Sequence, residues 1–302
     1  MTDPRAEIEK GNAALKSVLA ALLLTGLKVV VGITSGSLGI LAEAAHSGLD
    51  LLAAIVTLIA VRVSSIPADQ NHAYGHGKVE NLSALVETLL LLATCVWIIS
   101  EAVERLTAHE VVVDASIWTF LVMAVSIVVD VTRSRMLYRA ARKHRSQALE
   151  ADALHFSTDI WSSAVVIVGL AGVKLAGWFP HLSYMKRADA VAALMVAVIV
   201  VAVSLQLGRR TIQALLDAAP AGAAARIQEA VQSLDQVINC HAVRVRQSGP
   251  HYFVDLHILL EGGMSLHAAH EMTEQVEHTV QAILPGADVT VHPEPQPGTH
   301  PR

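Results

Sequence analysis

The sequence predicts an α-helical membrane protein with six transmembrane helices, followed by a small soluble α/β domain. Of the 302 residues, 53% are hydrophobic and only 16% are charged, whereas soluble domains usually carry about 25% charged residues. The apolar residues form long runs up to about residue 210, and the composition changes after residue 219. We therefore divide the chain into a transmembrane domain, residues 1–210, and a linker with a soluble C-terminal domain, residues 211–302.

Six apolar stretches are long enough to cross a bilayer, since a hydrocarbon core about 30 Å thick needs about 20 helical residues. Polar, Gly-rich or Pro-containing breaks separate several of them, at 34–37, 64–78 and 177–187. The predicted spans are residues 12–33, 38–64, 79–106, 116–140, 148–176 and 188–208.

The distribution of Lys and Arg predicts the orientation. Thirteen of these residues lie at the span ends and loops on one side of the predicted membrane domain, and four lie on the other side. Because positively charged loops stay in the cytoplasm, we expect both termini to be cytoplasmic and the protein to lie in a bacterial inner (plasma) membrane. The net charge of −5 argues against a nucleic-acid partner.

The C-terminal segment alternates between helical and strand patterns. A helix is predicted over 224–234, strands over 241–247 and 251–260, a second helix over 266–284 and a last strand over 288–292. This αββαβ order predicts a small open sheet with two helices on one face, a ferredoxin-like arrangement. The segment also contains eight of the fifteen histidines, a density that composition alone does not explain.

One polar pattern occurs twice inside the predicted spans. An acid, then His three residues later, then Asp four residues after that, is found in span two and again 109 residues later in span five. Residues four apart share a helix face, so each span presents one imidazole beside one carboxylate. If the two spans touch, the four groups converge into a set of two nitrogens and two oxygens: His46, Asp50, His155 and Asp159.

A divalent metal is the natural partner of such a set. Each Asp at the bilayer centre costs about 2.5–3.5 kcal/mol, and a dication supplies the charge that offsets this cost. Interhelical hydrogen bonds or a polar lining are the alternative, which the identical spacing disfavours. Two nitrogens and two oxygens suit tetrahedral Zn²⁺ better than Mg²⁺ or Ca²⁺, while Fe²⁺, Mn²⁺, Co²⁺ and Ni²⁺ stay open.

Other polar residues receive weaker interpretations. Glu43 and Asp152, one turn before each His, are either supporting or entry-path acids or simply face water. We assign no role to Lys28, Glu87 and Asp130. In the loop after span two, Asp69, His72 and His76 offer one carboxylate and two imidazoles on a short segment, which is plausible for zinc but also common in a solvated loop.

The chain resembles the cation diffusion facilitator family over nearly its whole length. The resemblance rests on AEAAHSGLD in span two, the loop DQNHAYGHGKVE, and the tail segments HAVRVRQSGP, VDLH and VTVH. It implies a homodimer that exchanges divalent metal for protons, with metal sites in the membrane, in the loop and in the cytoplasmic domain. Matching positions assign the first two sites to the residues named above and the third to His241, His257, His270 and His292.

The resemblance leaves some roles open. Asp255 and Glu294 are candidate extra carboxylates of the third site, where Pro293 departs from the pattern of some relatives. Lys78 and Asp217 match positions at which some relatives form a charge interlock, although solvation explains them equally well.

We therefore expect a Zn²⁺/H⁺ antiporter that exports metal. Histidine can hold metal when neutral and a proton when the metal leaves. Fe²⁺, Mn²⁺, Co²⁺ or Cd²⁺ are alternative cargos, and a membrane metal sensor or scaffold that transports nothing is the rival function. An enzyme is not expected, since the chain lacks an H-E-x-x-H motif and a four-ligand site leaves no position for catalytic water.

Overall fold

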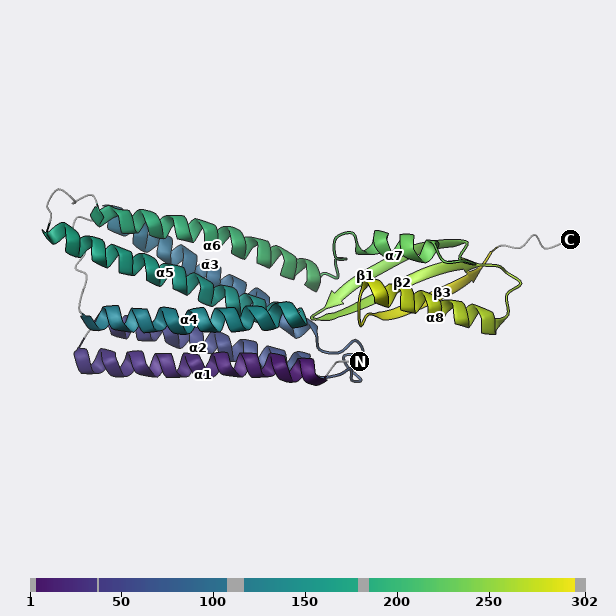
Figure 1. Cartoon of the computed structure of the whole chain (residues 1–302), viewed down its shortest axis with the longest axis horizontal. Coiled ribbons are helices and arrows are strands. Elements are labelled where there is room, and N and C mark those ends of the chain that lie inside the picture. The colour runs from purple at the N-terminus through teal and green to yellow at the C-terminus, as the bar shows by residue number, and fades with distance from the viewer. Residues whose placement is uncertain (1–3, 37, 108–116, 179–184, 297–302) are drawn as a thin grey trace. The chain divides into compact units, whose positions relative to one another are not determined.

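A computed structural model describes residues 4–36, 38–107, 117–178 and 185–296. The chain forms two compact units, one extending to Thr211 and the other beginning at Ile212. Figure 1 shows the first as a set of long helices and the second as a small sheet with two helices. Part of the predicted break at 177–187 lies outside the described residues.

Six long helices form the first unit, and they run side by side (Figure 1). Their bounds are α1 Pro4–Ser35, α2 Leu38–Ser64, α3 Lys78–Thr107, α4 Ile117–His144, α5 Gln147–Trp178 and α6 Met185–Leu215. The short α1–α2 connection includes Gly36, whose positive φ of 64° suits glycine.

Four of the described helical segments are long and apolar enough to cross a membrane. They are Arg5–Ser35, Glu43–Ser64, Lys78–Ser100 and Leu194–Leu215. The C-terminal half of α4 is rich in charge, from Asp130 and Arg133 onward. The prediction of six transmembrane spans therefore stays a prediction, while the presence of membrane-spanning helices is confirmed.

Helices α1 and α2 approach closely at a glycine. A Cβ placed on Gly32 of α1 would lie 2.8 Å from Leu41 Cδ2 of α2, so the absence of a side chain allows this contact. Near the other end, α1, α2, α4 and α5 share a core in which Phe156, Leu149 and Ala14 are fully buried. These contacts fix α2 and α5, which carry the repeated polar pattern.

The second unit has the element order that the sequence predicts. Its elements are α7 Ala223–Gln232, β1 Asn239–Ser248, β2 His251–Leu260, α8 Leu266–Ile283 and β3 Asp288–Pro295. The sheet order is β1-β2-β3; β1 and β2 are antiparallel, and β2 and β3 are parallel. The parallel pair needs a crossover, which α8 supplies.

The core of this unit lies between the sheet and the two helices. Ile227 of α7, Ile258 of β2 and Val276 of α8 are among its fully buried members. Both helices begin at residues suited to that position: Gly222 precedes α7, and the Ser265 side chain accepts a hydrogen bond from Ala268 N at the start of α8. The register of the three strands, described below, decides which histidines lie next to one another.

Candidate metal centres

The four residues of the repeated pattern meet between α2 and α5. His155 Nε2 lies 3.0 Å from Asp50 Oδ1 and 3.7 Å from Asp159 Oδ2. His46 Nε2 lies 3.8 Å from Asp159 Oδ1 and 4.0 Å from Asp50 Oδ1. Each imidazole therefore faces the carboxylates of both helices. We call these four residues the membrane cluster.

Burial makes the membrane cluster chemically unusual. Asp50 and Asp159 are each 8% exposed and His155 is 5% exposed, while His46 is partly accessible. Among the described residues, no group forms a hydrogen bond to the buried His155 Nδ1. Two carboxylates in such a site need positive charge close by, and two imidazoles together with two carboxylates form a donor set that zinc accepts.

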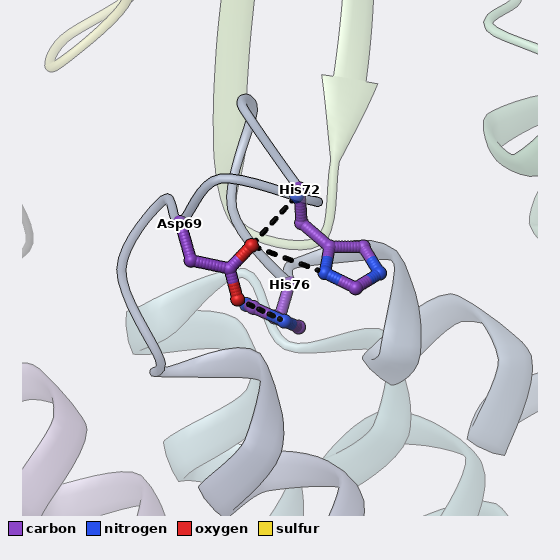
Figure 2. Close-up of side chains that lie close together, drawn as sticks. All are labelled: Asp69, His72 and His76. Carbon is purple, nitrogen blue, oxygen red and sulfur yellow. Dashed lines mark hydrogen bonds and ion pairs between the residues drawn. The ribbon is translucent and has the colours of Figure 1, made fainter.

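A second candidate centre lies in the loop between α2 and α3. Figure 2 shows Asp69 facing both imidazoles: His72 Nδ1 is 3.3 Å from Asp69 Oδ1, and His76 Nε2 is 3.5 Å from Asp69 Oδ2. The ligand-type atoms of these three residues all lie within 4.8 Å of one another. We call them the loop cluster.

The backbone of the loop prepares this arrangement. The N–H groups of His72 and Asn71 donate to Asp69 Oδ1, at 2.7 and 2.8 Å. The hydrogen bond from His72 N, helped by that from Asn71 N and by the nearby imidazoles, holds the pKa of the Asp69 carboxyl below its usual range. His76 Nδ1 lies 3.4 Å from the Ile66 carbonyl oxygen, which orients the other ring nitrogen toward Asp69. Gly75 turns the chain with a positive φ of 75°.

A third candidate centre follows from the register of the three strands. His241 of β1 is paired with His257 of β2, and His257 is paired with His292 of β3. The ring centroid of His257 lies 5.4 Å from that of His241 and 4.8 Å from that of His292. One row across the sheet thus places three imidazoles on neighbouring strands.

Glu294, two residues after His292 on β3, adds a carboxylate to these three imidazoles, and we call the four residues the tail cluster. Its Oε1 is 2.8 Å from His257 Nδ1, and its Oε2 is 3.3 Å from His241 Nε2. The hydrogen bond from His257, with the charges of the neighbouring imidazoles, keeps the pKa of Glu294 below its usual range. The structure thereby distinguishes Glu294 from Asp255, which is paired with Arg244 and Thr290 in the sheet register.

His270 lies apart from the tail cluster within this chain. It sits on α8, where its Nε2 is 3.5 Å from Glu274 Oε1, one turn along the same helix. A role for His270 as a ligand stays a prediction.

The sequence pattern did not predict a contact beside the membrane cluster, the hydrogen bond from Lys28 of α1 to Ser47 of α2. Lys28 and Ser47 are distant in sequence, so only the packing of α1 on α2 reveals this hydrogen bond.

Two family models match successive parts of the chain. Residues 14–216 match the cation efflux transmembrane domain, and residues 220–296 match the cytoplasmic domain of cation efflux proteins, a dimer-domain family. The cation-efflux pump FieF of Yersinia enterocolitica is 34% identical over 97% of this chain and 95% of its own length. FieF of Serratia proteamaculans is 33% identical over 96% of this chain and 94% of its own.

Among solved structures, one described as the mode of action of a putative zinc transporter CzrB aligns with 26% of this chain and 96% of its own, at 25% identity and a TM-score of 0.25. The family matches and the relatives extend over nearly the whole chain. The chain therefore belongs to the cation efflux family, the cation diffusion facilitators, and is an integral membrane protein that transports cations.

Proposed function

We propose that the protein is a Zn²⁺/H⁺ antiporter that carries zinc out of the cytoplasm. The observation that supports this function best is the membrane cluster, where the carboxylates of Asp50 and Asp159 meet two imidazoles in a buried site between α2 and α5. The two carboxylates neutralise the dication, and the two imidazoles complete a tetrahedral set.

Proton exchange follows from the same four groups. An imidazole binds metal only through an unprotonated nitrogen, so zinc binding displaces protons from His46 and His155. When zinc leaves, protons return to the imidazoles and restore positive charge beside the carboxylates. The site thus alternates between one dication and protons, which couples export of metal to entry of protons.

Transport requires the membrane cluster to open to each side in turn. We propose six membrane spans with both termini in the cytoplasm of a bacterial cell, and a homodimer whose helical unit rocks around the cluster. The dimer-domain match of residues 220–296 supports the oligomeric part of this proposal. The loop and tail clusters then bind zinc on the cytoplasmic side, where they have structural or regulatory roles.

Cargo other than zinc is a second candidate, because His and Asp also ligate Fe²⁺, Mn²⁺, Co²⁺ and Cd²⁺. The tail cluster also fits a sensor or scaffold that binds metal only through its tail. That function does not explain the membrane cluster. Intramembrane ionisable groups are costly and as a rule serve function. We therefore place transport first.

Flux into proteoliposomes tests the proposal. The purified protein is reconstituted with an acidic lumen, and uptake of each divalent ion is recorded together with a pH-sensitive dye. We expect zinc to enter fastest and the outside to acidify as protons leave. Zinc uptake without proton movement, after correction for binding of metal by buffer, would reject antiport; preference for another ion would reassign the cargo.

A further inference from the structure

A buried lysine lies beside the membrane cluster. Lys28 of α1 is only 4% exposed, and its Nζ donates to Ser47 Oγ at 2.7 Å and to Glu43 Oε2 at 3.2 Å. Both partners belong to α2, where Ser47 directly follows His46 and Glu43 precedes it by one helical turn. The lysine therefore contacts α2 on either side of a candidate ligand.

The position of α1 against α2 at this point is fixed by other contacts. Thr25 Oγ1 donates to the Ser47 carbonyl oxygen at 3.0 Å, one turn before Lys28. Close approach at Gly32 and Leu41 holds the two helices together on the other side of the lysine. The backbone of Lys28 is thus anchored, while its four-carbon side chain keeps the freedom to move its ammonium group.

The charge of Lys28 acts on the candidate ligands without ligating metal. It lies within electrostatic range of Asp159 and of Asp130. A protonated amine has three donors and no acceptor, so it is not a metal ligand. It is instead a rival of the metal for the carboxylates.

We infer that Lys28 is a tethered cation that competes with the transported dication for the Asp159 carboxylate, and that Glu43 holds it back. This inference rests on the proposed function, since it concerns the affinity of the same site. With metal in the cluster, the ammonium group stays with Glu43 and Ser47. When metal departs, the same positive charge is drawn toward the emptied carboxylates and disfavours rebinding.

Competition predicts opposite effects for the two members of the pair. Lys28→Gln removes the rival cation, so zinc should bind more tightly. Glu43→Gln releases the lysine toward the aspartates, so zinc should bind more weakly. A pair that only held α1 to α2 would weaken zinc binding in both variants, because either change would loosen the site.

The test measures zinc affinity of the purified full-length protein by competition with a chromophoric chelator. Asp69→Asn and His257→Ala in the background weaken zinc binding at the other two clusters, and the binding lost on adding Asp159→Ala defines the membrane cluster. We expect shifts of about fivefold or more in opposite directions, the usual scale for coupling between two charged sites. Lys28→Arg, which keeps the charge, should bind zinc like the parent.

Shifts in the same direction, or no shift, would overturn the inference. Dimer elution and the thermal midpoint of each variant report folding, and if Lys28→Gln does not fold, Lys28→Ala takes its place, because it also removes the rival cation and should likewise tighten zinc binding. Failure of the proposed function is a separate result. A parent protein that moves no zinc would reject antiport, while the opposite affinity shifts would still be measurable.

Discussion

At the scale of single residues, the three clusters differ mainly in burial. The membrane cluster is largely withdrawn from water, whereas Asp69 and His72 of the loop are exposed and Glu294 of the tail is half-buried. Exposed carboxylates cost little without metal, so the loop cluster has less need of an ion than the membrane cluster. Its preorganised backbone is what distinguishes it from an ordinary acidic loop.

The loop cluster should lose zinc on acidification through its imidazoles and not through Asp69. Because the pKa of Asp69 is lowered, its carboxyl takes up a proton only below its usual range. Between pH 7 and 5 it therefore stays ionised, while protons compete with zinc for the ring nitrogens of the two imidazoles.

Asp69→Asn should accordingly weaken zinc binding at the loop by about 10–100-fold at every pH in that range, without moving the pH midpoint. The measurement is chelator competition in a background that lacks the other two clusters. Asn71→Ala is the matched control, since Asn71 acts through its backbone N–H, which the substitution keeps. A midpoint that shifts in Asp69→Asn would contradict this assignment.

At the scale of elements, a buried ion pair joins several helix ends. Lys10 of α1 donates to Glu80 of α3 at 2.9 Å, and both side chains are almost fully buried. Glu80 also accepts hydrogen bonds from Ser64 at the end of α2 and from Ser146 in the α4–α5 turn. Four segments therefore depend on one carboxylate.

Lys10→Met should leave the Glu80 charge uncompensated and lower the free energy of unfolding by about 3–5 kcal/mol. The measurement is the thermal midpoint of the purified protein in detergent. Lys143→Met is the control: Lys143 pairs with Glu9 at the surface, where both side chains are at least half exposed, and such a pair contributes about 0–1 kcal/mol. Equal shifts for the two variants would show that the buried pair has no special role.

How far the sequence predicts these elements depends on the range of the contacts. The repeated pattern needs only the helical period and contact between two spans, so His46, Asp50, His155 and Asp159 were grouped correctly in space. The presence of three strands and their order along the chain likewise follow from local alternation, although β1 and β3 extend beyond the predicted ranges 241–247 and 288–292. Glu294 could not be chosen over Asp255 from the sequence, because the choice depends on the parallel register of β2 and β3, which α8 sets. Lys28 could be given no role from the sequence, because its partners lie 15 and 19 residues away on another helix.

At the scale of the whole molecule, transport and regulation are assigned to different units. The tail cluster belongs to the unit that begins at Ile212, whereas the membrane cluster belongs to the helical unit. A ligand shifts a conformational equilibrium only by its differential affinity for the two states. Zinc bound by His257 and His292 therefore regulates transport only if it favours one arrangement of the dimer.

Replacing His257 and His292 together by Ala should change the zinc concentration that gives half-maximal flux and leave measurable maximal flux. The comparison is made in proteoliposomes, with His267→Ala as a control because this histidine is exposed on α8, where its Nε2 lies 3.5 Å from Glu271 Oε1 of the same helix. Complete loss of flux in a folded dimer would make the tail cluster obligatory. An unchanged concentration dependence would show that it does not regulate.

Zinc flux through Asp159→Ala is the decisive measurement for the transport site, because Asp159 contacts both imidazoles of the membrane cluster and belongs to neither the loop cluster nor the tail cluster. One remaining carboxylate cannot neutralise a dication in a buried site. The account predicts that proteoliposomes containing Asp159→Ala take up zinc no faster than empty liposomes, while the variant elutes as a dimer with a thermal midpoint close to that of the parent. Uptake at the parent rate by this variant would contradict the assignment of the transport site.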